Sequence, residues 1–220
     1  MDQEKRDLLA LLIDEEVLQF GSFVLKSGRQ SPYFFNLGAI NSGAAITALG
    51  EAYARKITSL DFSFETLFGP AYKGIPIAVS AAQALARQGN DTGWAFNRKE
   101  AKAHGEGGQF VGASVQGRVL LVDDVLTAGT ALREAAQLII AAGGELVGVV
   151  IALDRQELLD SGTAVANLSA ELAIPVTSIL TLQDVIEYLD LIGREGNHSQ
   201  QELAQVKAYQ AQYCQLGTSG

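Results

Sequence analysis

The sequence predicts an α/β protein with a central, mostly parallel sheet flanked by helices, joined by a small hood from the N-terminal segment. Three observations support this prediction. From residue 42 onward, short apolar runs alternate with amphipathic stretches of helical period. The runs 119–122 and 146–153 are continuously apolar, as parallel strands are when helices cover both faces of the sheet. The 220 residues contain no internal repeat and no linker, so we expect a single domain over 1–220.

The first forty residues predict the hood. Residues 5–19 repeat leucine at helical spacing with acidic side chains opposite, which indicates an amphipathic helix. Residues 20–25 and 33–37 are aromatic and β-branched runs separated by a turn-rich link, which is typical of paired strands. We therefore expect a hood made mainly by residues 1–40 and completed by helices from the C-terminal end of the sequence.

The remaining elements follow the alternation in order. Helices are predicted near 43–58, 74–88, 129–142 and 182–191, and strands near 65–69, 92–97, 118–122, 146–153 and 175–180. Ser199 and Glu202 have the spacing of a capping box, which predicts a final helix. Residues 97–117 interrupt the pattern with five glycines that follow a group of basic side chains. A long irregular segment in a compact domain is usually either a functional lid or disordered, and the basic side chains favour a lid. We therefore expect a mobile lid at about 98–112.

Composition and charge exclude several classes of protein. With 48% hydrophobic and 19% charged residues, the chain is too apolar to be disordered, yet no run approaches the ~20 apolar residues of a membrane span. The first residues lack the apolar core and cleavage site of a secretory signal, so we expect a cytoplasmic protein. The single cysteine, Cys214, excludes an intramolecular disulfide. A net charge of −9 argues against nucleic-acid and membrane partners, so an anionic ligand needs a local basic cluster.

The segment 119–131 has the most informative chemistry. A buried strand is predicted to end in two carboxylates, Asp123 and Asp124, and a short Thr/Gly loop then opens a helix. Ligands of open parallel sheets bind at the carboxyl ends of strands. The loop hydroxyls and N–H groups suit a phosphate monoester, and the carboxylates suit sugar hydroxyls or hydrated Mg²⁺. In the alternative, Asp124 begins a turn and Thr127 or Thr130 caps the helix, which leaves the other carboxylate unexplained.

Two nucleotide-binding fingerprints are absent from the sequence. A P-loop nucleotidase also has a strand that ends in Asp, but it requires G-x-x-x-x-G-K-[ST]. The nearest approach, residues 21–27, has Leu25 where the second glycine must stand. The segment that begins at Gly105 fails G-x-G-x-x-G because Phe110 occupies the last glycine position.

The strand, the carboxylate pair and the loop Thr127-Ala128-Gly129-Thr130 resemble the phosphoribosyl pyrophosphate signature of type I phosphoribosyltransferases. Further segments resemble the orotate phosphoribosyltransferases within that family and occur in the same order across most of the chain. These segments are 20–29, 31–36, 69–76, 97–107 and 153–157. The signature alone indicates the superfamily, whereas the basic loop together with Phe34-Phe35 makes the orotate family specific.

The resemblance implies the type I phosphoribosyltransferase fold and a defined reaction. Ribose 5-phosphate would move from phosphoribosyl pyrophosphate to N1 of orotate, giving orotidine 5′-monophosphate and pyrophosphate in pyrimidine biosynthesis. The implied cofactor is Mg²⁺, bound mainly through the substrate pyrophosphate and the ribose hydroxyls. A homodimer is also implied, with each lid reaching the neighbour's site. Such catalysis rests on electrostatic positioning of a leaving anion, which the basic side chains of two glycine-bearing loops would supply.

The resemblance also implies site residues. The catalytic set is Lys102, His104, Asp123 and Asp124. Phosphoribosyl pyrophosphate would bind Lys26, Tyr72, Lys73, Arg98, Lys99, Lys102, His104, Asp123, Asp124, Val125, Leu126, Thr127, Ala128, Gly129, Thr130 and Ala131. Orotate would bind Phe34, Phe35, Thr127 and Arg155. A non-proline cis peptide bond is expected between Ala71 and Tyr72.

Several alternatives stay open at this stage. Each cation alone is by default a solvated surface residue, and His104 contacts a ligand with or without transferring a proton. Arg155 either binds the orotate carboxylate or forms an ion pair with Glu157 or Asp154. The transferase could act on another base, such as uracil or a purine. A regulator that binds phosphoribosyl pyrophosphate without chemistry is the alternative from another class, and it is disfavoured by the acidic charge.

Overall fold

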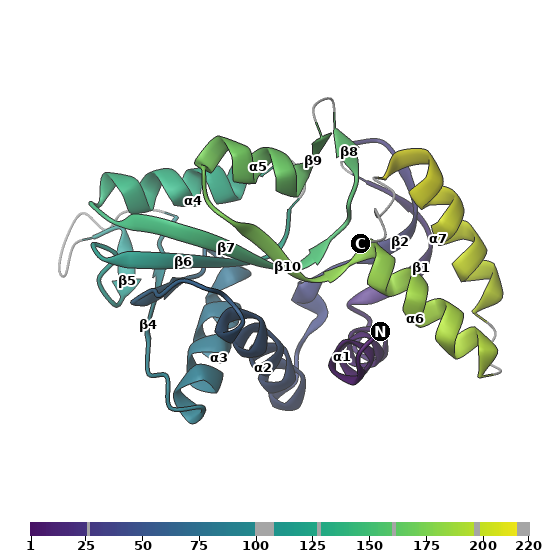
Figure 1. Ribbon diagram of the computed structural model, residues 1–220, viewed down its shortest axis with the longest axis horizontal. Helices are drawn as coiled ribbons and strands as arrows, with labels where there is room; N and C mark the ends of the chain where they lie inside the picture. Colours follow the sequence, from purple (N-terminus) through teal and green to yellow (C-terminus); the bar gives the residue numbers. More distant parts are fainter. Residues whose placement is uncertain (26, 100–107, 127–128, 160–161, 196–198, 215–220) are drawn as a thin grey trace.

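Figure 1 shows a twisted sheet between two layers of helices, in a computed structural model that describes residues 1–25, 27–99, 108–126, 129–159, 162–195 and 199–214. The helices are α1 (Gln3–Asp14), the 3-10 helix η1 (Leu37–Ala39), α2 (Gly43–Thr58), α3 (Gly74–Arg87), α4 (Thr130–Ala141), α5 (Ala164–Leu172), α6 (Leu182–Arg194) and α7 (Gln200–Tyr213). The strands are β1 (Leu18–Val24), β2 (Gln30–Phe35), β3 (Thr66–Phe68), β4 (Gly93–Asn97), β5 (Phe110–Gly112), β6 (Arg118–Val125), β7 (Glu145–Asp154), β8 (Leu158–Leu159), β9 (Gly162–Thr163) and β10 (Val176–Thr181).

The central sheet has six strands in the order β10-β7-β6-β3-β4-β5. Every neighbouring pair is parallel except β4 and β5, which are antiparallel. The prediction of a mostly parallel sheet flanked by helices is therefore confirmed. Helices α4 and α5 cover one face, and α2 and α3 cover the other (Figure 1).

The continuously apolar strands are explained by two cores, one on each face of the sheet. Leu120 and Val122 of β6 belong to the cluster that includes α2 and α3, whereas Val119 and Leu121 belong to the cluster that includes α4. Successive side chains of a strand point to opposite faces, so both sets must be apolar when both faces are covered. All four of these side chains are fully buried.

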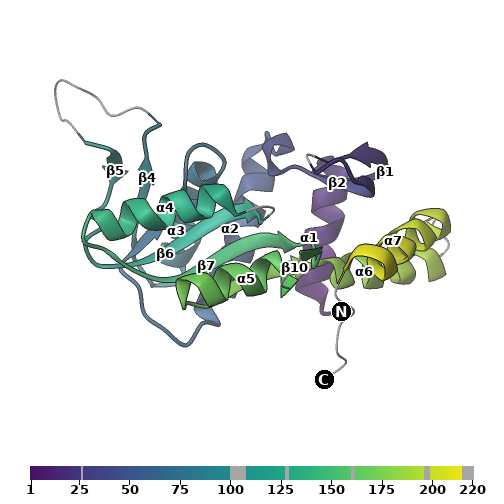
Figure 2. The same cartoon turned by 90° about the horizontal axis from the view of Figure 1, so that it is seen from above.

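The hood consists of α1, the β1–β2 hairpin, α6 and α7, which gather at one end of the sheet in both views (Figures 1 and 2). The hairpin is antiparallel, and α7 packs against β2. The ring of Tyr33 meets the ring of Tyr209 edge to face, with 6.0 Å between centroids. Lys5 of α1 forms a 2.8 Å ion pair with Asp184 of α6. Segments from opposite ends of the sequence thus form one substructure, as predicted.

Three predicted boundaries or motifs are wrong. The first helix ends at Asp14 rather than near 19, because Glu16 adopts a positive φ of 55° and strand β1 then begins. The Ser199 hydroxyl donates to the backbone oxygen of Leu189 instead of capping α7, so the capping box predicted there is absent. Strand β6 continues to Val125, which places both carboxylates inside the strand rather than after it. Within the described residues, no helix is long and apolar enough to cross a membrane.

Candidate active site

The strand order reverses between β3 and β6, which lie side by side in the sheet. After β3 the chain crosses to β4 on one side, and after β6 it crosses to β7 on the other. In open α/β sheets the crevice for a ligand forms at such a switch point, at the carboxyl ends of the strands. The two loops at this place are residues 69–73 after β3 and residues 126–129 after β6.

An ion pair joins these two strand ends. The ammonium of Lys73 lies 2.8 Å from Oδ2 of Asp124, and Oδ1 of Asp124 accepts a hydrogen bond from the backbone N–H of Val125. The Asp124 side chain is 10% exposed, whereas that of Lys73 is 49% exposed. The structure therefore brings a predicted pyrophosphate cation and a predicted catalytic carboxylate together, with the cation open to solvent.

The buried carboxyl of Asp123 has a raised pKa. Its burial, followed by the charge of Asp124, raises the pKa of its carboxyl from 3.8 to about 7, while a hydrogen bond from the Asp124 backbone and the charge of Lys73 act the other way. The buried hydroxyl of Tyr53 on α2 donates to the Asp123 backbone oxygen at 2.7 Å. This carboxyl can therefore change its charge near neutral pH.

The loop after β3 is tightly folded. The peptide bond between Ala71 and Tyr72 is cis, as expected from the resemblance, and the N–H of Ala71 donates to Oδ1 of Asn97 at 3.1 Å. A Cβ on Gly69 would overlap the backbone oxygen of Gly74, so only glycine fits there. Tyr72 is 67% exposed. It borders a hollow of ≈ 510 Å³ that is also lined by Lys73 and by the start of α2.

The structure describes two cations of the basic segment, Lys99 and Arg98. The Lys99 ammonium is 4.5 Å from the centre of the Tyr72 ring, which is the geometry of a cation–π contact. The Arg98 guanidinium donates to the backbone oxygen of Gly108 at 2.9 Å, across the base of the basic segment. Lys26, Lys102, His104, Thr127 and Ala128 lie outside the described residues. The predicted lid at 98–112 is in part a strand, because β5 pairs with β4.

The start of α4 has the form of an anion site. Gly129 is the N-cap residue with φ 75°, which favours glycine, and it supplies no side chain to cap the helix. Thr130 is the first helical residue and is exposed, so the interpretation of Thr130 as a capping residue is wrong. The first backbone N–H groups of a helix have no partner within the helix, and they attract anions. A short loop separates this terminus from Asp123 and Asp124 along the chain.

The predicted orotate residues Phe34, Phe35 and Arg155 lie in the hairpin and just after the end of β7. Phe35 is buried in the core, whereas Phe34 is 39% exposed and stacks on Phe23 with 5.5 Å between ring centroids. Arg155 is buried, with Nε donating to Glu157 at 2.6 Å and Nη2 donating to Ser31 at 3.1 Å. The ion pair considered as an alternative for Arg155 is therefore present, and it lies against the hairpin.

Three residues that form hydrogen bonds at the candidate site were not predicted from the sequence. Asn97 could have been identified as a polar residue at the carboxyl end of a predicted strand. Tyr53 and Tyr209 each look like an ordinary core residue of an amphipathic helix. Only the fold reveals that Tyr53 holds the backbone at Asp123 and that Tyr209 donates to Glu157.

Known proteins share both the sequence and this architecture. A family model described as a phosphoribosyl transferase domain matches residues 36–166. An orotate phosphoribosyltransferase of Chromohalobacter salexigens is 51% identical over 220 residues, covering 95% of this chain and 94% of that protein. One of Pseudomonas aeruginosa is 49% identical over 215 residues, covering 97% and 99%. The crystal structure of orotate phosphoribosyltransferase from Francisella tularensis has a TM-score of 0.82 and 37% identity, covering 95% of this chain and 100% of that chain.

These matches agree with the geometry of the site. The family model spans more than half of the chain, including the paired carboxylates and the start of α4. The two relatives extend the likeness over almost the whole length, hood included. The chain therefore belongs to the phosphoribosyltransferases and, among them, to the orotate phosphoribosyltransferase family.

Proposed function

We propose that this protein transfers the ribose 5-phosphate of phosphoribosyl pyrophosphate to N1 of orotate, releasing pyrophosphate and forming orotidine 5′-monophosphate. One observation carries the proposal. The helix terminus at Gly129 follows Asp123 and Asp124 at the switch point of the sheet, and Lys73 comes from the neighbouring strand end to meet Asp124. Such a place offers a phosphate site, hydroxyl acceptors and a cation within one crevice.

Each part of the substrate has a matching group of residues. The 5′-phosphate would take the loop and helix terminus from Val125 to Ala131, and the ribose hydroxyls would take Asp123 and Asp124. The leaving pyrophosphate would be neutralised by a set of basic side chains. In this proposal they are Lys26, Lys73, Arg98, Lys99, Lys102 and His104. Cations that meet developing negative charge stabilise the transition state more than the bound substrate.

Orotate would lie between the hairpin and the end of β7. Phe34 offers an exposed aromatic face for the pyrimidine ring. Arg155 supplies a cation for the carboxylate, and Thr127 would lie between the phosphate loop and the base. We also place the reaction in the cytoplasm, since phosphorylated sugars do not cross membranes unaided.

The residues present fit Mg²⁺. This ion keeps several waters and uses one or two carboxylates together with substrate phosphates. Asp123 and Asp124 supply that number of carboxylates, and among the described residues no group of three or more His, Cys, Asp or Glu forms a cage for a metal. When bound, Mg²⁺ would withdraw charge from the pyrophosphate. The carboxylates would orient it through its waters and the ribose hydroxyls.

We further propose a homodimer in which the lid of one chain serves the site of the other, so that Lys102 and His104 act across the interface. Mixed dimers of Lys102→Ala and Asp124→Ala chains test this arrangement. With sharing, one site of each mixed dimer keeps both residues, so about half of the wild-type activity per dimer remains. Complete loss of activity in the mixed dimer would show that each lid serves its own chain.

The reaction is tested by the loss of orotate absorbance when purified protein is mixed with phosphoribosyl pyrophosphate and Mg²⁺. Parallel reactions contain uracil or hypoxanthine in place of orotate. Consumption of orotate that requires phosphoribosyl pyrophosphate supports the proposal. Turnover of uracil or hypoxanthine instead would reassign the base. No turnover of any base, with phosphoribosyl pyrophosphate still bound, would indicate a regulator.

A further inference from the structure

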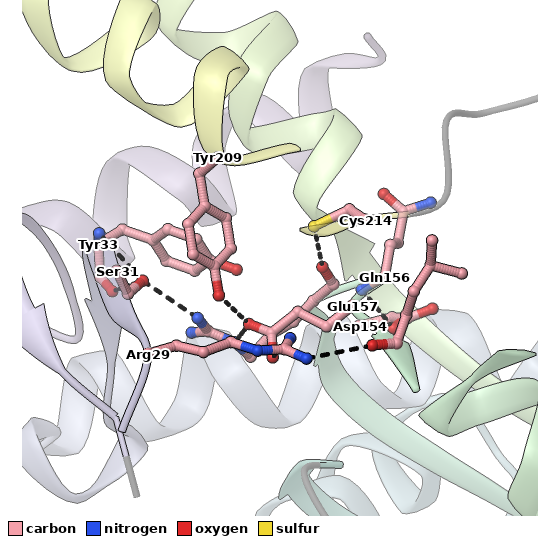
Figure 3. A network of polar contacts seen from close by, with 10 residues as sticks. Arg29, Ser31, Tyr33, Asp154, Gln156, Glu157, Tyr209 and Cys214 are labelled. Carbon is pink, nitrogen blue, oxygen red and sulfur yellow. Dashed lines mark hydrogen bonds and ion pairs between the residues drawn. The ribbon is translucent and has the colours of Figure 1, made fainter. Parts of the chain in front are cut away.

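The carboxylate of Glu157 is the centre of a polar network between the hairpin, β7 and α7 (Figure 3). Its Oε1 accepts from Nε of Arg155 at 2.6 Å and from the hydroxyl of Tyr209 at 2.7 Å. Its Oε2 lies 3.7 Å from Nη1 of Arg29. Three side chains from three separate segments thus meet one acidic group, which is itself largely buried at 18% exposure.

The network fixes the orientation of the Arg155 guanidinium. Glu157 and Ser31 each accept a hydrogen bond from one of its N–H donors, and its Cζ lies 4.2 Å from the centre of the Tyr33 ring. A buried arginine held by a carboxylate, a hydroxyl and an aromatic face has lost the rotamer freedom that a solvated arginine keeps. The direction of its other N–H donors is therefore fixed as well.

The network joins two guanidinium groups through one carboxylate. Arg29 approaches the same carboxylate as Arg155, so neither arginine has Glu157 as its partner alone. Asp154, the other nearby acid, accepts a hydrogen bond from the backbone N–H of Gln156. Burial and then the hydrogen bond to Glu157 raise the pKa of Tyr209 to about 12, so its hydroxyl stays a donor at neutral pH.

We propose that Glu157 is a positioning residue for recognition of the base, and that Tyr209 extends this control to helix α7. Glu157 accepts a hydrogen bond from Nε of Arg155. The terminal nitrogens of the guanidinium are thereby preorganised to bind the carboxylate of orotate. This inference rests on the proposed function, because it assigns a role within the orotate site. It predicts that a change on α7 alters the affinity for the base and leaves that for the sugar phosphate unchanged.

The test compares steady-state kinetics of the full chain with Glu157→Gln and Tyr209→Phe. Glu157→Gln keeps the shape and removes the charge, so KM for orotate should rise about tenfold, with KM for phosphoribosyl pyrophosphate changed less than about twofold. Tyr209→Phe keeps the ring and removes one hydrogen bond, so the same KM should rise by a smaller factor of about three. Tyr213→Phe is the matched control, because it removes a hydroxyl from the same helix and keeps the ring that lies against Arg29 and Tyr209.

The outcomes separate this inference from the proposed function. Wild-type protein that fails to consume orotate refutes the proposed function, and the inference then fails with it. With active wild-type protein, a selective rise of KM for orotate in Glu157→Gln and Tyr209→Phe, absent in Tyr213→Phe, supports the inference. An unchanged KM for orotate, or an equal rise for both substrates, overturns it. If Glu157→Gln does not fold, the result for Tyr209→Phe decides by the same criterion.

Discussion

Replacing Asp123 by asparagine should change how the stability of the protein depends on pH. The carboxyl is buried, and its pKa in the folded protein is about 7 against 3.8 in an exposed chain. Between these values the unfolded chain releases a proton that the folded protein keeps. The contribution of Asp123 to stability is therefore greatest below pH 3.8 and is lost as the pH rises to about 7. Asparagine carries no charge and removes this loss.

The magnitude follows from the displacement of the pKa. From 3.8 to about 7 is roughly 3 units, and at ~1.4 kcal/mol per unit the ionised carboxyl costs the folded state at most ~4 kcal/mol. About 1–2 kcal/mol of this cost is already present near pH 5, and all of it is present near pH 8. The free energy of unfolding of Asp123→Asn relative to wild type should thus increase by ~2–3 kcal/mol between about pH 5 and about pH 8.

Urea unfolding of both proteins at several pH values and one fixed protein concentration measures this change. Any constant effect of the amide cancels, because only the difference between pH values is used. Asp61→Asn, which replaces an exposed carboxylate, is the control and should show no comparable trend. A stability difference between Asp123→Asn and wild type that stays the same from pH 5 to pH 8 would refute the reasoning. The variant should also lose activity, since Asp123 belongs to the proposed ribose site.

Three further predictions concern the site loop, a helix cap and the metal. Gly69→Ala should lower the free energy of unfolding, measured in urea, by ~1–3 kcal/mol, because the new Cβ would overlap the Gly74 backbone oxygen. The control Gly43→Ala should cause no such loss, because the space around Gly43 is open. Thr181→Ala should cost ~1 kcal/mol and lower Tm by ~2–4 °C, because it removes the capping box with Asp184; calorimetry checks this. Chelation with EDTA should abolish orotate consumption until Mg²⁺ is restored, without shifting the Tm of the ligand-free protein.

The alternation of strands and helices in the central part of the chain could be predicted from the sequence, because hydrophobic periodicity is a local signal. Helix α2 spans the predicted residues 43–58, and β7 differs from its prediction by one residue at each end. The strands β8 and β9 have two residues each, too few for a period to emerge, and β5 lies within the glycine-rich segment that interrupts the pattern. Helix α1 ends early because the turn into the hairpin overrides a helical pattern that continues past Asp14.

The candidate site divides in the same way. The carboxylates Asp123 and Asp124 and the loop that follows form one continuous motif, so their chemistry could be inferred without a structure. The contacts that hold them are long-range. Lys73 is 51 positions from Asp124, and Glu157 is 52 positions from Tyr209. No periodicity or spacing predicts such pairs, because they depend on which strand ends and helices the fold brings together.

The packing of α7 on β2 sets an order for folding during synthesis. The hairpin is made early and α7 is the last helix, yet the Tyr33 ring of the hairpin is fully buried in the finished protein, against Tyr209. Until α7 has left the ribosome, this apolar surface must stay open to solvent, where it favours aggregation. A chain shortened before α7 should therefore be recovered mainly in the insoluble fraction, even though every strand of the central sheet is present in it.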